Sequence, residues 1–226
     1  MAPKNKYAKR SRISEGRFRQ FIKLFALDLQ AGQIASGTRL NRNTVNRYLR
    51  SIRERIAEHC EDQSPLADEV KEDESNFSAK IGKGVRERNV IGKSVVFGII
   101  ERNGFVYTQI VPSMSRKTLK AIIRRRVEPD NVFHSDTWKC YDGLMDLGYK
   151  KHYRVRHDDN EYAMDNSPIH GIESFWGYAK TRLARFRGIH KSTFYLHLKE
   201  CEFRFNNRKN NLYLLLLKII RDNPLF

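Results

Sequence analysis

The sequence predicts an α/β protein with a mixed sheet and flanking helices, preceded by a small all-α region. Three observations predict this fold class. Apolar residues recur at helical spacing before residue 53, the spacing becomes that of strands after residue 90, and helical spacing returns from residue 169. With 226 residues, of which 40% are hydrophobic, the chain can form one large domain or two modest ones.

The charge of the chain predicts a polyanionic partner. Lys and Arg number 43 against 26 Asp and Glu, which gives a formal net charge of +17. Nucleic acid fits this balance better than an anionic membrane surface. Residues 1–60 alone hold 14 basic and 4 acidic side chains, so we expect this part of the chain to be the main DNA-binding region.

Composition also excludes several classes of protein. The chain has no run of eighteen apolar residues, and residues 1–12 lack the apolar stretch of a secretory signal. We therefore expect a soluble cytoplasmic protein, associated with the nucleoid. The three cysteines are too widely spaced to predict a disulfide framework or a zinc site: Cys60, Cys140 and Cys201.

Three helices are predicted before residue 61. The first has apolar residues at helical spacing from Phe18 to Leu29, and the second covers residues 31–35. Residues 37–40 form a short turn, after which Asn41 is a favourable N-cap for the third helix. Val45, Tyr48, Leu49 and Ile52 give this third helix its buried face.

The outward face of the third helix predicts contact with DNA. It carries Arg42, Asn43, Asn46, Arg47 and Arg50. In a helix-turn-helix, the second helix of the pair presents such side chains to base edges and phosphates. The alternative is a small helical bundle whose solvated face is basic.

An acidic segment separates this region from the rest of the chain. Seven Asp and Glu and one Lys lie between residues 61 and 74, and Ser64-Pro65 interrupts any helix. We therefore expect a helix-turn-helix region at 1–60, an acidic linker at 61–68, and an α/β domain with C-terminal helices at 69–226.

The α/β domain opens with strands. Residues 93–100 are apolar on both faces, as in an internal strand, and Asn103-Gly104 predicts a two-residue hairpin turn to a partner strand at 105–111. A helix at 115–127 and a strand at 131–136 then give a crossover connection, and residues 149–155 form a further strand. The remaining helices are expected at 169–186, at 192–207 and from residue 212.

Three carboxylates are candidates for a metal site, although each has a structural explanation by itself. Asp73 lies in a charged run, Asp136 ends a strand where it can cap a helix, and Glu173 lies on a helix. However, ligands commonly bind beyond the carboxyl ends of parallel strands, and Asp136 lies at such an end. Glu173 and Lys180 both lie beside Trp176, at one edge of the apolar stripe of their helix. Carboxylates gathered together need a cation to neutralise them, and Mg²⁺ binds carboxylate and phosphate oxygens.

Five segments of the chain resemble the DDE transposases of the insertion-sequence-1595 family, which carry the ISXO2-like transposase domain. The resemblance covers about residues 18–225. The segments are Gly92-Lys-Ser-Val-Val-Phe-Gly-Ile-Ile, Tyr107-Thr-Gln-Ile-Val-Pro, His134-Ser-Asp-Thr-Trp, Gly171-Ile-Glu-Ser-Phe-Trp with Ala179-Lys180, and Glu202-Phe-Arg-Phe-Asn-Asn-Arg208.

This resemblance implies a ribonuclease-H-like catalytic domain that cuts and joins the DNA ends of its own insertion sequence. It places the catalytic, metal-binding triad on Asp73, Asp136 and Glu173, and a DNA-binding residue on Lys180. It implies two Mg²⁺ or Mn²⁺ ions and double-stranded DNA as partner. Because two ends are joined in one event, we expect a homo-oligomer on DNA.

Two other functions stay open at this stage. One is a metal-dependent nuclease or resolvase that cuts without strand transfer, and the other is a catalytically inactive repressor that still binds DNA. Residues 202–208 mix Phe and Arg and are compatible with a DNA clamp, although Phe at helical spacing is more often core. We expect His134 to be a structural residue of its strand, and assign no role to His157 or His170.

Overall fold

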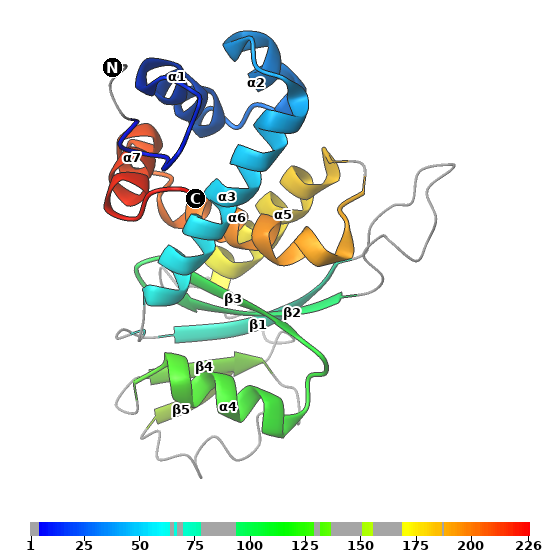
Figure 1. The fold of residues 1–226 in the computed structure, drawn as a ribbon. Helices are drawn as coiled ribbons and strands as arrows, with labels where there is room; N and C mark the ends of the chain where they lie inside the picture. The colour runs from blue at the N-terminus through cyan, green and yellow to red at the C-terminus, as the bar shows by residue number, and fades with distance from the viewer. Residues whose placement is uncertain are drawn as a thin grey trace. The chain divides into compact units, whose positions relative to one another are not determined.

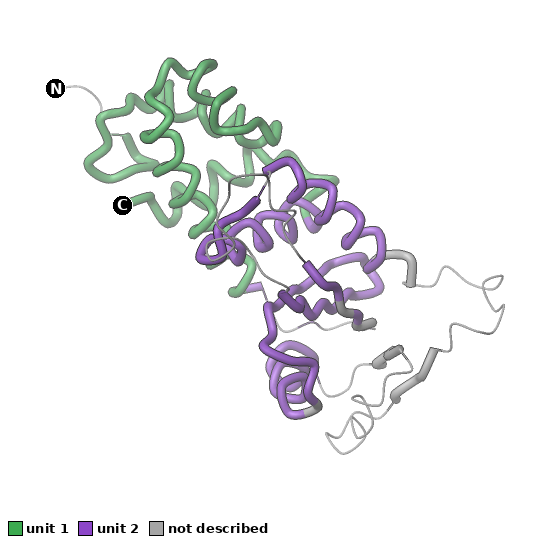
Figure 2. The backbone as a smooth tube through the Cα atoms, turned by 90° about the vertical axis from the view of Figure 1, so that its right-hand side faces the viewer, with its two compact units in different colours: residues 1–62, 207–226 green, residues 63–206 purple. Residues whose placement is uncertain are grey.

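The computed structural model describes residues 5–63, 66, 70–77, 94–128, 132–136, 151–155, 169–186 and 188–226. They form seven α-helices and five strands (Figure 1). The chain divides into two compact units, coloured separately in Figure 2. The first consists of residues 1–62 with 207–226, and the second of residues 63–206.

The first unit begins with the three helices that the sequence predicts. They are α1 (Glu15–Ala26), α2 (Ala31–Thr38) and α3 (Arg42–Asp62). The side chain of Ser14 caps α1, and Asn41 Oδ1 accepts a hydrogen bond from the backbone N–H of Asn43 at 2.8 Å at the start of α3. The turn between α2 and α3 contains Arg39 in the left-handed conformation, with φ of 53°.

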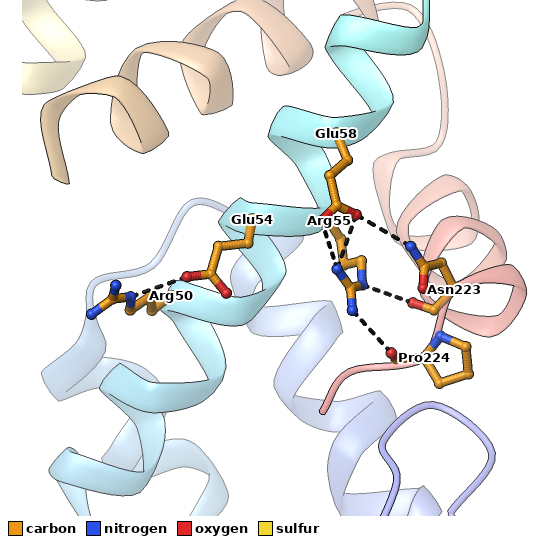
Figure 3. Close-up of polar contacts among 6 residues, drawn as sticks. All are labelled: Arg50, Glu54, Arg55, Glu58, Asn223 and Pro224. Carbon is orange, nitrogen blue, oxygen red and sulfur yellow. Dashed lines mark hydrogen bonds and ion pairs between the residues drawn. The ribbon is translucent and has the colours of Figure 1, made fainter.

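Helix α7 (Leu212–Asp222) completes this unit, contacting both α1 and α3. Leu216, Leu217 and Ile220 are buried. The chain after α7 is held by α3: Arg55 donates to the carbonyl oxygens of Asn223 and Pro224 at 3.2 and 3.3 Å, and Asn223 donates to Glu58 at 3.2 Å (Figure 3). Residues 207–226 were expected in the α/β domain, but they belong to the helical unit, where buried apolar side chains of α7 complete the core.

The second unit contains a five-stranded mixed sheet in the order β3-β2-β1-β4-β5. Strands β2 (Ser94–Glu101) and β3 (Val106–Val111) form an antiparallel hairpin, and β1 (Val70–Phe77) is antiparallel to β2. Strands β4 (Val132–Asp136) and β5 (Lys151–Val155) continue the sheet in parallel with β1. This arrangement confirms the predicted mixed sheet and the internal position of residues 93–100.

The hairpin turn differs by one residue from the prediction. The backbone N–H of Glu101 donates to the carbonyl of Phe105 at 2.8 Å, so three residues rather than two form the loop. Gly104 has φ of 85°, which favours glycine, and the side chain of Asn103 accepts from the N–H of Phe105. Both residues that predicted the turn are therefore used, in a longer loop.

Helices cover both faces of the sheet. Helix α4 (Arg116–Arg126) connects β3 to β4, as predicted for the crossover, and packs Leu119, Ile122 and Ile123 against Phe97 and Ile99 of β2. The opposite face meets α5 (Ile169–Ala184) and α6 (Phe194–Asn206) through Val96, Ile100 and Val106. Alternate residues of β2 thus enter two separate apolar layers, which explains why this strand is apolar on both faces.

Candidate functional site

Asp73 lies on β1, the middle strand of the sheet. The charged pattern around Asp73 did not predict a strand. The segment nevertheless forms β1, in which Val70, Ser75 and Phe77 are buried. The carboxylate of Asp73 is half-buried, and its Oδ2 accepts a hydrogen bond from the indole N–H of Trp176 at 3.0 Å. Since Trp176 belongs to α5, Asp73 faces the layer formed by α5 and α6.

Asp136 is the last residue of β4, the parallel neighbour of β1. Val70 pairs with Phe133, and Lys71 pairs with His134. The described pairing ends there. Asp73 and Asp136 each come two residues later on their strands, so we expect them to lie at a similar level. Side chains of β4 lie outside the described part of the structure, and the position of the Asp136 carboxylate stays a prediction.

Glu173 and Lys180 lie on α5, and both side chains are exposed. The apolar stripe of this helix is as predicted: Ile172, Phe175, Trp176, Ala179 and Leu183 are buried. Glu173 precedes Trp176 by three residues, which places the two on neighbouring positions of the helix surface. The ammonium of Lys180 lies 6.0 Å from the ring centroid of Phe77 on β1.

These positions fit a site for divalent metal in their chemistry. Carboxylate oxygens are the ligands that Mg²⁺ prefers, and one candidate, Asp73, is already oriented by a neutral donor. Among the side chains that the structure describes, no three His, Cys, Asp or Glu gather closely enough to hold an ion. Because the Asp136 side chain is outside that set, convergence of the three acids stays a prediction.

The histidines of the sequence analysis add nothing to the described site. The side chains of His134 and His170 and the whole of His157 lie outside the described residues. Their roles stay unassigned.

Residues 202–205 form part of the core, whereas Arg208 is exposed, so the aromatic residues of this segment are core residues rather than a surface for stacking on DNA. Phe203 is 1% exposed and Phe205 is 8% exposed. Glu202 is also buried; its Oε2 accepts hydrogen bonds from the backbone N–H and the hydroxyl of Thr108 and from Lys199. Burial raises the pKa of Glu202, although Lys199 and Thr108 act in the opposite direction.

A second group of buried charges joins α5 to α6. Glu200 of α6 accepts hydrogen bonds from Arg182 of α5 and from Arg204, the latter at 2.9 Å. All three side chains are at most 5% exposed. Arg182 also donates to the sulfur of Cys201 at 3.5 Å. The network fixes the packing of α5, the helix that carries Glu173, and nothing in the amino-acid pattern predicted it.

In the first unit, the predicted DNA-binding face of α3 is exposed. Arg42, Asn43, Asn46, Arg47 and Arg50 are all exposed, whereas Val45, Tyr48, Leu49 and Ile52 are buried. Arg50 forms an ion pair with Glu54 at 3.1 Å (Figure 3), and the guanidinium of Arg47 lies 4.5 Å from the ring centroid of Phe226. The amphipathic pattern read from the sequence is thus confirmed for this helix.

The sequence matches one family over most of its length. A sequence model of the ISXO2-like transposase domain matches residues 65–206. The chain belongs to this family. The match includes all five strands and helices α4, α5 and α6, together with the three candidate acids and Lys180.

The chain is similar to one curated protein sequence and, more distantly, to several solved structures. A protein of Haemophilus influenzae described as an uncharacterized transposase-like protein is 42% identical over 113 residues, which cover 50% of this chain and 90% of the relative. The catalytic core of BIV integrase aligns with 66% of this chain and 93% of its own at 17% identity and a TM-score of 0.40. A pre-cleavage Mos1 transpososome aligns over 93% and 79% at 15% identity, with a TM-score of 0.35. Both TM-scores are below 0.5, so neither superposition establishes a shared fold.

Two features of the site were missed by the sequence analysis. One is the hydrogen bond from Trp176 to Asp73, because Trp176 was assigned only to the apolar stripe. The other is the role of Gly98, which pairs with Asp73 across β1 and β2. A glycine inside an apolar strand was the available signal, since it often marks a close approach of another group.

No helix among the described residues is long and apolar enough to cross a membrane.

Proposed function

We propose that this member of the ISXO2-like family is a DNA transposase that binds the terminal repeats of its insertion sequence, cleaves the ends and joins the 3′-hydroxyl to target DNA. The observation that carries the proposal is the register of β1 and β4. Continued by two residues beyond Lys71 and His134, this register would bring Asp73 and Asp136 to one level on adjacent parallel strands, and α5 adjoins Asp73 through Trp176. The strand order agrees with the ribonuclease-H-like core that the family resemblance implies.

In this proposal Asp73, Asp136 and Glu173 hold two Mg²⁺ or Mn²⁺ ions. When bound, such a pair of ions activates the attacking oxygen and stabilises the leaving oxygen of a phosphodiester. The three carboxylates supply oxygen ligands from β1, β4 and α5. Lys180 lies two turns after Glu173 on the same helix and is exposed, so its ammonium is available to bind a DNA phosphate.

DNA recognition is assigned to the first unit. Helices α2 and α3 form the helix-turn-helix, and α3 carries exposed Arg and Asn on the face away from its buried residues. Asn is suited to adenine and Arg to guanine or phosphate. We further propose that the protein acts as a homo-oligomer on DNA, since two transposon ends must be brought together.

The experiment is a cleavage assay with a duplex that carries the ends of the element, taken from the DNA flanking the gene. With Mg²⁺, the wild-type protein should nick the duplex at the element end. Asp73→Asn, Asp136→Asn and Glu173→Gln should each reduce the rate by at least about a hundredfold, as expected on losing a group that stabilises charge in the transition state. Glu128→Gln is the matched control, since this carboxylate is exposed and lies in the same unit.

The outcomes separate the three candidate functions. Joining of pre-cleaved ends to target DNA supports the transposase, whereas nicking without joining supports the nuclease or resolvase. If the wild type and the three acid variants bind the duplex but are equally inert, the protein is a repressor. Cleavage by Asp136→Asn at the wild-type rate would remove Asp136 from the proposed site.

A further inference from the structure

The indole of Trp176 makes a specific polar contact with a candidate metal ligand. The side chain of Trp176 is 5% exposed, and its N–H donates to Oδ2 of Asp73 at 3.0 Å. An indole has one hydrogen-bond donor and no acceptor, so a buried tryptophan must place this donor on an acceptor. Here that acceptor is the carboxylate on which the proposed chemistry depends.

Gly98 provides the space that this contact requires. It is paired with Asp73 in the register of β1 and β2, and the indole lies directly over it. A Cβ atom at position 98 would lie 2.6 Å from Cζ2 and 2.8 Å from Cη2 of Trp176. Glycine within a strand normally weakens it. In β2 it allows the indole to reach across the sheet to Asp73.

Neighbouring aromatic rings fix the direction of the indole. The ring of Trp176 lies 5.9 Å from that of Phe77 on β1 and 5.0 Å from that of Phe175, centroid to centroid. Contact on several sides leaves a buried ring one well-packed orientation. The N–H of Trp176 is therefore a donor in a fixed position rather than a mobile one.

We propose that Trp176 is a positioning residue that orients the Asp73 carboxylate for binding divalent metal, and that Gly98 makes this possible. The inference rests on the proposed function, because it assumes that Asp73 is a metal ligand. Hydrogen bonds to a ligating carboxylate fix its orientation, and losing such an outer partner typically weakens metal binding about 10- to 100-fold. Trp176 touches no reacting atom in this proposal.

The test measures metal binding directly, without DNA or turnover. Mn²⁺ is titrated calorimetrically into the wild type, Trp176→Phe and Asp73→Asn. Phenylalanine keeps most of the ring contacts but removes the donor. We expect Asp73→Asn to abolish binding and Trp176→Phe to weaken it about 10- to 100-fold.

Two further variants separate positioning from packing. Leu183→Ala truncates a buried side chain on the same apolar stripe of α5 and leaves Trp176 and both of its neighbouring rings in place; it should lower the midpoint of thermal unfolding but leave the affinity for Mn²⁺ near that of the wild type. Gly98→Ala retains both Trp176 and Asp73 but forces the indole to shift. It should weaken Mn²⁺ binding as Trp176→Phe does.

A spectroscopic measurement on the wild type keeps the proposal testable if a variant fails to fold. The chain has two tryptophans, so protein labelled with ¹⁵N-tryptophan gives two indole N–H signals. Added Mg²⁺ should shift the signal of Trp176, and Asp73→Asn should abolish that shift.

The results distinguish failure of this inference from failure of the proposed function. If Asp73→Asn loses Mn²⁺ while Trp176→Phe binds it as tightly as the wild type, Trp176 has no positioning role and the proposed function stands. Equal losses of affinity in Leu183→Ala and Trp176→Phe would also overturn the inference, because packing alone would explain them. If Asp73→Asn binds Mn²⁺ like the wild type, both proposals fail.

Discussion

Cys201 is fully buried in the core of the second unit. Its sulfur is enclosed between α5 and α6, and burial raises the pKa of the thiol from its usual 9.0 to about 11, against the smaller opposing effect of Arg182. The folded state therefore holds the thiol proton more tightly than the unfolded state does. The resulting stabilisation is complete below pH 9 and is lost as the pH rises toward 11.

This difference predicts a measurable pH dependence of stability. Between pH 9 and 11 the wild type should lose about 2 kcal/mol more free energy of unfolding than Cys201→Ala, with the steepest loss near pH 10. Urea unfolding of both proteins at pH 8, 9, 10 and 11 measures the difference. Parallel curves for the two proteins across this range would show that the Cys201 thiolate is solvated in the folded state.

At the level of single residues, the spacing of apolar residues predicted correctly which side chains are buried, but it did not predict which polar side chains form hydrogen bonds with each other. The apolar stripe of α5 was predicted because its spacing follows the helix period. The hydrogen bonds from Trp176 to Asp73 and from Thr108 to Glu202 were not predicted, since a hydrogen-bond partner about 100 residues away leaves no periodic signal. Gly98 had a signal, but only the structure identified the group that occupies the space.

Helix α3 is the element on which the proposed DNA recognition depends. Its exposed cations are not committed to strong internal contacts: the ion pair of Arg50 with Glu54 joins side chains that are 70% and 42% exposed. Such pairs contribute at most about 1 kcal/mol. A DNA phosphate can therefore replace Glu54 as the partner of Arg50 at little cost.

We predict that Arg42→Ala with Arg50→Ala weakens binding to element-end DNA and reduces its salt dependence. Each lost phosphate contact should make the slope of log affinity against log salt concentration less negative by about 0.9, so by about 1.8 for the pair. Fluorescence anisotropy from 50 to 300 mM salt measures the slope. Arg221→Ala, an exposed cation on α7 of the same unit, should leave the slope unchanged; an equal effect there would indicate that only net charge matters.

Elements were predicted most reliably where one periodicity dominates. All three N-terminal helices, the β2–β3 hairpin and the β3–α4–β4 crossover are present. Strand β1 could not be derived from pattern because its acidic residues obscure the alternation, and only the family resemblance assigned Asp73. The central strand can carry Asp73 because its carboxylate is only half-buried and meets the indole N–H of Trp176 rather than an apolar layer.

On the scale of the whole molecule, the helical unit is built from both ends of the sequence. Helix α7 contacts α1 and α3, and the backbone N–H of Lys9 donates to the carbonyl of Leu225 at 2.8 Å. The sequence analysis could not predict this, because an apolar helix after residue 211 shows that it must be buried but not against what. The partner of such a helix is a property of the tertiary fold.

We predict that Ile220→Ala destabilises the helical unit by about 2–5 kcal/mol, because Ile220 is fully buried and its truncation leaves a cavity. Hydrogen exchange should become faster in α1, α3 and α7, with little change in β1–β3. Leu214→Ala is the control on the same helix, since Leu214 is 59% exposed. Equal acceleration in the sheet would show that the two units unfold as one.

The division of the chain also orders events during synthesis. Residues 207–226 leave the ribosome after residues 63–206, so the sheet has all of its strands before the helical unit can close around α7. Until then α1 and α3 lack the apolar surface that α7 supplies. The helical unit is therefore completed only after the whole sheet unit has been translated, although its first three helices are synthesised earlier.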